Sequence, residues 1–391
     1  MINEIKAKSL HMKTLLEASK PLRVVGIWPT NHTTITDIRF AIIITYYTIF
    51  VVMEYCDLFY VFGDLELVIL NLLETTYHTV IITRIYMIRF NGLVRQVIKD
   101  IEDDHDEFYG SEEEKKITIE CHAIGVSSYA TIMFWIVTGI SAWYLTPVTN
   151  YIIARLNNET GLLILPYRIP TFFNLTSFKP TAGIYMFEMG LNYFAVCLGS
   201  SCNVLSTAVN NVCCRLAVLT YRVKNLKLDA DGNNHRQIFR NLCASHLRTM
   251  RLIKTIDNAF HLTFLSELLL LMTETSVILY NIIHHWDNME IVYVVSLSAC
   301  CVFMISIIGI NCVMGQNLLD KSLELNEAYW QCIWYDMPVS GKKLFMILMI
   351  SSQSPLQLTA GKFYLYSLSN FVSILKTCVV YASILRTVQY R

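Results

Sequence analysis

The chain has 391 residues, of which 54% are hydrophobic and only 16% are charged. A soluble protein of this length does not bury so much apolar surface, so the composition indicates a polytopic α-helical membrane protein. The 31 basic and 31 acidic residues give no formal net charge, and no basic block is interleaved with aromatic residues, which argues against nucleic-acid binding.

The N-terminal segment, residues 1–37, is predicted to lie in the cytoplasm. It begins with a predicted amphipathic helix that would rest on the inner leaflet, and a frayed cytosolic leader is the alternative. Charged residues are scattered through its early positions, so no cleavable signal peptide is expected. One face of the helix would consist of Ile5, Ser9, Met12, Leu15 and Leu16.

Seven apolar runs follow, each close to or above the ~20 residues that a transmembrane helix needs. They are Ile38–Phe62, Leu65–Ile88, Ile124–Leu145, Gly183–Val209, Phe260–Ile283, Ile291–Val313 and Leu358–Thr387. A further run, Leu344–Ile350, is too short to span. The predicted fold is therefore an all-α membrane protein with seven transmembrane helices. Six form a bundle over residues 38–313, residues 314–357 form cytoplasmic helices, and the seventh occupies residues 358–391.

The basic residues predict the orientation of the chain. Most of the 31 lysines and arginines fall in the N-terminal segment and in the second, fourth and sixth connections, whereas the opposite loops hold Arg155, Arg168 and Lys179. Because positive residues stay in the cytoplasm, the N-terminus is predicted inside and the C-terminus outside, the reverse of a G-protein-coupled receptor. The fourth connection is predicted to extend both flanking helices into the cytoplasm, with a break at residues 229–234.

The third connection, between Thr146 and Pro180, is predicted to be extracellular. Its prolines disfavour regular structure and suggest a cap over the mouth of the bundle. Two sequons in it, at Asn158 and Asn174, are predicted glycosylation sites. A third sequon, at Asn31, falls on the predicted cytoplasmic side and should stay unmodified.

The sequence contains no catalytic or cofactor-binding motif, so the chain is predicted not to be an enzyme and to need no cofactor. The cysteines are not spaced as zinc ligands, and none lies in the predicted outer loops. At His284 and His285 an exposed polar turn is favoured over a metal site, so no metal is predicted.

Six acidic residues fall within the predicted spans, where a carboxylate is costly unless it is paired or hydrated. They would either line a water-filled cavity or pair with polar neighbours, and pairing is favoured for each one taken alone. They are Glu54, Asp57, Glu74, Glu188, Glu267 and Glu274. The last span raises the same question, because Lys362 and Lys376 within it must find water, a partner or a membrane edge.

A series of motifs near the C-terminus resembles the signature of the insect odorant receptors, and Gly26-Ile-Trp-Pro29 is similar to that family's N-terminal motif. The fourth connection lacks the long insertion of the family's shared co-receptor, so the chain looks like a ligand-tuning subunit. The motifs are Gly315-Gln316, Ala328-Tyr329, Trp334-Tyr335, Lys342-Lys343, Ser352-Gln-Ser-Pro355, Ala360-Gly-x-Phe363, Ser367-Leu-x-x-Phe371 and Ile374-Leu-Lys376.

The resemblance implies an odorant-gated, non-selective cation channel in the plasma membrane of olfactory sensory neurons. It implies a heterotetramer with the co-receptor, embedded in lipid, that binds a small volatile hydrophobic molecule and conducts monovalent and divalent cations. The last span would line a central pore with a hydrophobic gate at Ile384, Thr387 and Val388, of which Ile384 and Val388 share one helical face. Residues 314–357 would form a cytoplasmic anchor between subunits, with packing residues Gln316, Tyr329, Trp330, Trp334 and Tyr335.

The resemblance also implies a closed apolar pocket in the outer half of the bundle, and the geometry of the second to sixth spans supplies candidate contacts. Aromatic and methionine side chains there suit a small, weakly polar molecule bound by shape and dispersion. The candidates are Leu73, Tyr77, Phe134, Trp135, Thr138, Met186, Met189, Tyr193, Tyr280 and Tyr293. Ordinary core packing is the alternative for each of them.

Three alternative functions stay open. A gustatory receptor channel of the same superfamily would share the architecture, but its usual Thr-Tyr-x-x-x-x-x-Gln-Phe ending is not present. A G-protein-coupled receptor would need the reverse orientation, and the sequence lacks Asp-Arg-Tyr and Asn-Pro-x-x-Tyr. A secondary transporter would show internal repeats, and the sequence has no recognisable one.

Overall fold

The computed structural model describes residues 15–30, 33–63, 65–103, 111–157, 162–167, 178–226, 235–284, 291–337 and 339–389. Several predicted features lie outside these residues: the first half of the amphipathic helix, the break at 229–234, His285, and the sequons at Asn31, Asn158 and Asn174. The side chains of Tyr293 and Val388 are also outside the description, although both residues are helical.

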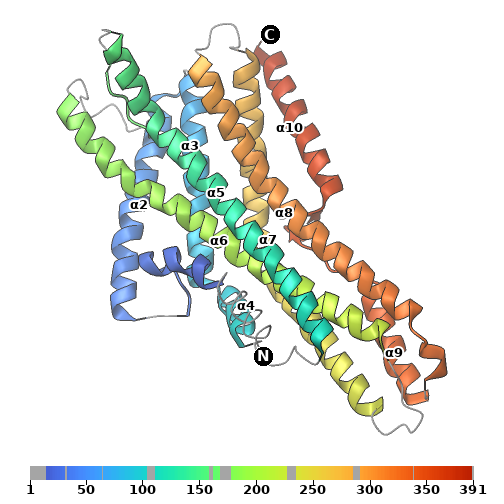
Figure 1. The fold of residues 1–391 in the computed structure, drawn as a ribbon. Helices are drawn as coiled ribbons and strands as arrows, with labels where there is room; N and C mark the ends of the chain where they lie inside the picture. The colour runs from blue at the N-terminus through green and yellow to red at the C-terminus, as the bar shows by residue number, and fades with distance from the viewer. Residues whose placement is uncertain are drawn as a thin grey trace.

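The chain is almost entirely helical, as predicted. Residues 15–25 form a first helix. The helices that follow are α2 (Thr34–Tyr60), α3 (Leu65–Phe90), α4 (Gly92–Asp103), α5 (Glu112–Leu156), α6 (Phe178–Lys224), α7 (His235–His284), α8 (Ile291–Gln331), the short 3₁₀-helix η2 (Trp334–Asp336), α9 (Val339–Ser352) and α10 (Leu368–Gln389). Two short strands, β1 (Thr359–Ala360) and β2 (Tyr364–Leu365), precede α10 (Figure 1).

Six helices in the described part of the chain are long and apolar enough to cross a membrane: α2, α5, α6, α7, α8 and α10. The predicted second span, α3, is not among them. Its inward face carries buried Asn71, Glu74, His78 and Arg84, which lower its hydropathy. Such a helix suits the interior of a bundle, where neighbouring helices rather than lipid satisfy its polar groups. The count of seven spans therefore remains a prediction that depends on α3.

Four helices are longer than a bilayer crossing requires. Helices α5, α6, α7 and α8 have 45, 47, 50 and 41 residues, and at about 1.5 Å per residue each exceeds the ~30 Å hydrocarbon core roughly twofold. Helix α8 passes without a break through the predicted boundary at residue 313, so the bundle and the predicted anchor share one continuous helix. Helix α9 packs on α7 and α8, at the end of the molecule opposite the C-terminus (Figure 1).

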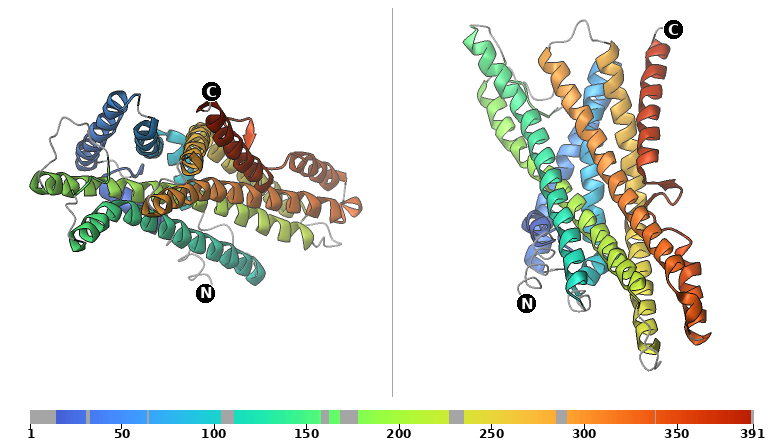
Figure 2. Two further views of the ribbon diagram at one scale, coloured as in Figure 1. Left: turned by 90° about the horizontal axis from the view of Figure 1, so that it is seen from above. Right: turned by 45° about the vertical axis from the view of Figure 1, so that its right-hand side comes forward.

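Helix α10 lies at one edge of the bundle in all three views (Figures 1 and 2), where it packs mainly against α7 and α8. It begins at Leu368, whereas the predicted span begins at Leu358. The prediction was wrong there because residues 358–367 form a hairpin, with Thr359 opposite Leu365 and Ala360 opposite Tyr364. Its turn holds consecutive residues with left-handed backbones, Gly361 at φ +63° and Lys362 at φ +68°, which end any helix.

The hairpin is fastened to the middle of α7. The Asp257 carboxylate accepts hydrogen bonds from the backbone N–H and the hydroxyl of Thr359, both at 2.8 Å, and from Lys362 Nζ at 2.5 Å. The Gly361 N–H donates to the carbonyl oxygen of His261 at 2.8 Å. Lys362 therefore belongs to this polar attachment and not to helix α10. Its ammonium group has a partner in the Asp257 carboxylate.

Helix α8 holds the other side of the hairpin through Gly315 and Gln316. The Gln316 Oε1 atom accepts a hydrogen bond from the N–H of Leu368 at 3.2 Å, which satisfies one of the free donors at the start of α10. Gly315 lies so close to the backbone of Tyr366 that an added methyl group would overlap the Tyr366 carbonyl oxygen. The Gly-Gln pair thus fixes where α10 begins.

Replacing Gly315 with alanine is expected to destabilise the chain by about 1–3 kcal/mol, because the overlapping atom is backbone and cannot rotate away. The matched control is Gly309→Ala on the same helix, where the new methyl group would meet Phe371 at an ordinary 3.5 Å and better helix propensity should stabilise by roughly 0.5–1 kcal/mol. Thermal unfolding of the detergent-solubilised variants would measure both. Equal stability of the two variants would contradict this packing.

Candidate functional site

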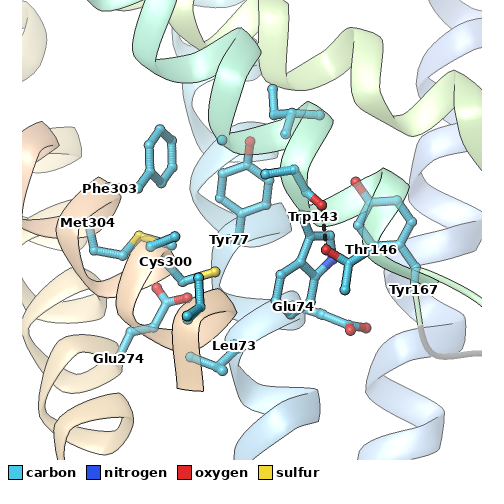
Figure 3. Close-up of a pocket in the computed structure, with 15 residues that line it drawn as sticks. Leu73, Glu74, Tyr77, Trp143, Thr146, Tyr167, Glu274, Cys300, Phe303 and Met304 are labelled. Atoms are coloured by element: carbon cyan, nitrogen blue, oxygen red, sulfur yellow. Dashed lines mark hydrogen bonds between the residues drawn. The ribbon is translucent and has the colours of Figure 1, made fainter. Parts of the chain in front are cut away.

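A cavity of about 380 Å³ lies between α3, α5, α7 and α8, with Tyr167 of the segment 162–167 at its wall (Figure 3). Its volume falls near the lower end of the roughly 300–1,000 Å³ that is usual for small-molecule sites. The lining residues are Leu73, Glu74 and Tyr77 from α3; Gly139, Ile140, Ala142, Trp143 and Thr146 from α5; Tyr167; Glu274 from α7; and Val295, Ala299, Cys300, Phe303 and Met304 from α8.

Helical spacing explains which side chains reach the cavity. The lining residues of α5 and of α8 recur three, four or seven positions apart, as residues on one face of a helix do. Small residues on these faces, namely Gly139, Ala142 and Ala299, leave room between the helices. The aromatic rings of Tyr77, Trp143, Tyr167 and Phe303 surround that room (Figure 3).

Most polar atoms around the cavity are already satisfied within the protein. The Trp143 indole N–H donates to the carbonyl oxygen of Pro166 at 3.1 Å, and the Thr146 hydroxyl donates to that of Ala142 at 2.7 Å. The Tyr167 hydroxyl donates to Asn192 Oδ1 at 2.8 Å. Among the described residues, the hydroxyl of Tyr77 and the Oε2 atom of Glu274 are buried without a hydrogen-bond partner. The cavity is thus apolar, with a few polar atoms left for a ligand.

Of the ten predicted ligand contacts, Leu73 and Tyr77 line this cavity. Trp135 lines a much smaller pocket between α5, α6 and α8, and Tyr280 is buried outside the cavity, in a cluster with Ala382 of α10. The remaining described candidates face outward on α5 and α6 and do not line it: Phe134, Thr138, Met186, Met189 and Tyr193.

The cavity is also lined by residues that are not among the predicted contacts: Trp143, Thr146, Tyr167, Phe303 and Met304. Depth in the membrane predicts how far along a helix a contact lies, but not which face of the helix points inward. The signal that could have found α5's lining face is the row of small residues at Gly139 and Ala142, because a lipid-facing surface has no need of them.

The acidic residues of the spans have three kinds of surroundings. Glu54 Oε2 lies 2.8 Å from His78 Nδ1, Asp57 Oδ2 accepts from Asn71 at 3.1 Å, and Glu267 makes a two-pronged contact with Arg84. These acids pair with polar neighbours within the bundle. Glu74 and Glu274 instead line the cavity, and Glu188 is buried on α6.

The predicted gate residues lie near the end of α10. Ile384 is 50% exposed in the single chain, and Thr387 is exposed as well. Lys376 on the same helix is also exposed, whereas Ile374, Cys378 and Ala382 face the bundle. Helix α10 therefore presents a wide surface, including the Ile384 side, that this chain alone does not cover.

The predicted anchor residues differ in exposure. Tyr329 is fully buried, and its hydroxyl lies 3.1 Å from His246 Nδ1, so it packs within its own chain. Trp330 and Tyr335 are 54% and 60% exposed, and Trp334 is half-buried. Gln316 caps α10, as described above. Trp330 and Tyr335 are therefore the two of these residues most available to a neighbouring subunit.

Comparison with known proteins gives one family and one fold. The family model of the 7tm odorant receptors matches residues 64–379. The odorant receptor coreceptor of Harpegnathos saltator is 24% identical over 140 residues, which is 36% of this chain and 29% of that protein. The coreceptor of Drosophila melanogaster is 31% identical over 74 residues, 19% of this chain and 15% of that protein. The matches thus span less than a third of these relatives' length.

Solved structures resemble the whole chain in fold. The insect olfactory receptor OR5 from Machilis hrabei in complex with eugenol superposes with a TM-score of 0.82, at 14% sequence identity, over 96% of this chain and 98% of that one. A second structure of the same receptor superposes with a TM-score of 0.77 at the same identity, over 96% of this chain and 97% of that one. The arrangement of helices is therefore the one found in that receptor.

Proposed function

The chain belongs to the 7tm odorant receptor family, and we propose that it is the ligand-tuning subunit of an odorant-gated, non-selective cation channel in the plasma membrane of olfactory sensory neurons. The channel is a heterotetramer with the co-receptor. The cavity between α3, α5, α7 and α8 binds a small volatile molecule, and the α10 helices line the central pore. The N-terminus is cytoplasmic and the C-terminus extracellular.

The observation that carries this proposal is the position of α10. A membrane-length helix at the edge of the bundle, with Lys376 and Thr387 exposed, is poorly suited to lipid on all of its free surface. A ring of such helices around water would satisfy the polar positions. Ile384, Thr387 and Val388 then form a constriction that excludes water from the resting pore.

Helix α7 supplies a route from the cavity to the pore helix. One side of α7 contributes Glu274 to the cavity. The other side packs on α10, where Tyr280 meets Ala382 and the Met272 carbonyl oxygen lies 3.7 Å from the Cys378 thiol. A ligand that prefers one position of α7 therefore shifts the balance between closed and open pores, by as much as its preference for the open state. In the open state α10 tilts away from the pore axis.

The test is to express the chain with the odorant co-receptor and to record whole-cell current during application of a panel of volatile compounds. Ligand-evoked current should persist when G-protein signalling is blocked with GDP-β-S in the pipette. The co-receptor alone is the control. A response that vanishes with the G-protein block, or a chain that reaches the surface and never adds a response to that of the co-receptor, would defeat the proposal.

Replacing Trp330 and Tyr335 together with alanine is expected to weaken subunit assembly by about tenfold or more, since exposed aromatic side chains are common energetic centres of interfaces. The thermal stability of the single chain should change little, because both side chains are more than half exposed. Phe59→Ala, at an 81% exposed position on α2, is the matched control. The tetramer fraction can be measured by mass photometry; an unchanged fraction would remove these residues from the anchor.

A further inference from the structure

Glu274 is a buried acid with an unused oxygen. Its residue is 5% exposed, it lines the cavity, and its Oε2 atom has no hydrogen-bond partner among the described residues. A carboxylate oxygen shielded from water in this way is costly unless a cation or a hydrogen-bond donor reaches it. The Glu274 residue lines a space large enough for a small molecule.

The described residues that line the cavity include no lysine, arginine or histidine, and a second acid, Glu74, contributes to the same wall. The basic side chains that α3 buries pair with other acids: His78 with Glu54, Arg84 with Glu267 and Arg89 with Asp37. Within the part of the chain that the structure describes, the cavity wall therefore offers Glu274 no cation, and a bound ligand could supply one.

The rest of the wall favours an organic cation over a hydrated metal ion. Tyr77, Trp143, Tyr167 and Phe303 line the space, and the faces of such rings attract ammonium groups. The Tyr77 hydroxyl, buried without a partner among the described residues, offers a second acceptor. The other lining residues are mostly apolar, as an alkyl or aryl group requires.

We propose that the cavity takes a volatile amine that binds in its protonated form. The inference rests on the proposed function, because it assigns the ligand class of the same site. The ammonium group lies between Glu274 and the ring of Tyr77 and donates a hydrogen bond to the Glu274 carboxylate. The hydrocarbon part fills the space beside Trp143 and Phe303. A neutral molecule of the same shape leaves the carboxylate without a cation and binds more weakly.

The test compares amines with alcohols that share their carbon skeleton, such as hexylamine with hexanol and 2-phenylethylamine with 2-phenylethanol. Each is applied to the unmodified channel formed with the co-receptor. The amine of at least one pair should have a half-maximal concentration at least about tenfold lower than its alcohol, as expected for a charge-assisted hydrogen bond. Equal or greater potency of the alcohol in every pair would overturn the inference.

Variants of Glu274 test whether its negative charge, rather than the shape of its side chain, determines the sensitivity to the amine. Glu274→Gln should raise the half-maximal concentration of the amine by about tenfold to a hundredfold while leaving that of the alcohol nearly unchanged. Glu274→Asp keeps the negative charge, so it should raise the half-maximal concentration of the amine by less than Glu274→Gln does. A response to the alcohol confirms that the Gln variant folds. A Gln variant that keeps full amine sensitivity would overturn the inference.

A binding measurement distinguishes failure of this inference from failure of the proposed function. Thermal unfolding of the purified complex should shift upward with the amine and much less with the matched alcohol, because a ligand of the folded state stabilises in proportion to its affinity. An amine-specific shift without evoked current would support the amine site and count against the channel. Current evoked by neutral odorants alone, with no amine-specific shift, would support the channel and refute the amine site.

Discussion

Replacing Ile384 and Val388 with alanine is expected to raise the current that flows without ligand by about tenfold. An apolar constriction blocks ions by keeping water out, and each removed methylene group lowers that resistance by about 0.8 kcal/mol. The two residues are one turn apart on α10 and share a face, so the double variant widens one ring of the pore and makes it wettable. A change of 1.4 kcal/mol already corresponds to a factor of ten.

The matched control for the gate is Val379→Ala. Val379 is 56% exposed on the same helix, and at 100° per residue it lies nearly opposite the mean direction of Ile384 and Val388. Leak current in the absence of ligand, normalised to surface expression, measures the effect. If Val379→Ala leaks as much as the double variant, or if neither leaks, the constriction is not formed by the proposed residues.

The fold could be predicted from the sequence because the length and apolar composition of a segment identify it as a membrane helix. The positions of α2, α6, α7 and α8 follow from that signal. The prediction from length and composition was wrong at residues 358–367, where the apolar run continues but Gly361 and Lys362 form a turn. An apolar composition sets burial, not backbone shape, so a short hairpin inside the protein looks like the start of a span.

The site was harder to predict than the fold, for a physical reason that the candidates on α6 illustrate. Met186 and Met189 are the side chains that a ligand pocket favours, and both sit in the predicted outer half of a span. They are 66% and 57% exposed. In a membrane protein the lipid-facing surface is as apolar as the interior, so hydrophobicity does not mark the inward face. Leu73 and Tyr77 line the cavity because α3 has polar neighbours, Asn71 and Glu74, that fix which side is buried.

The acidic residues of the spans indicated the buried faces of the helices better than the apolar residues did. Their cost inside a membrane could be inferred from the sequence, but their partners could not, since His78 and Arg84 reach them from other helices. Only the packed bundle shows that Glu54 and Glu267 pair with His78 and Arg84, whereas Glu274 lines the cavity with an oxygen that has no partner among the described residues. An acidic residue within a predicted span therefore indicates which face of the helix is buried in the bundle. Whether that acid pairs with a neighbour or lines a cavity depends on tertiary contacts.

Replacing Arg84 with leucine is expected to destabilise the chain by about 3–5 kcal/mol, because it strands the Glu267 carboxylate inside the bundle. The Arg84 guanidinium is 1% exposed and Glu267 is 3% exposed. Arg84 Nη2 donates to Glu267 Oε2 at 2.7 Å, and the guanidinium also lies 5.7 Å from the ring centre of Phe264. Loss of one partner should leave little correctly folded protein at the cell surface.

The double variant Arg84→Leu with Glu267→Leu should recover most of that loss. It removes both charges, and with them Arg84 Nη1, which is buried without a hydrogen-bond partner among the described residues, so the cost of desolvating the pair disappears as well. The exposed pair of Lys20 and Glu17 is the control, and Lys20→Ala should change stability by less than about 1 kcal/mol. Thermal unfolding and surface labelling of the single and double variants give the coupling energy. If the double variant is no more stable than Arg84→Leu alone, Arg84 stabilises the bundle through its contacts with the aromatic rings and not by neutralising Glu267.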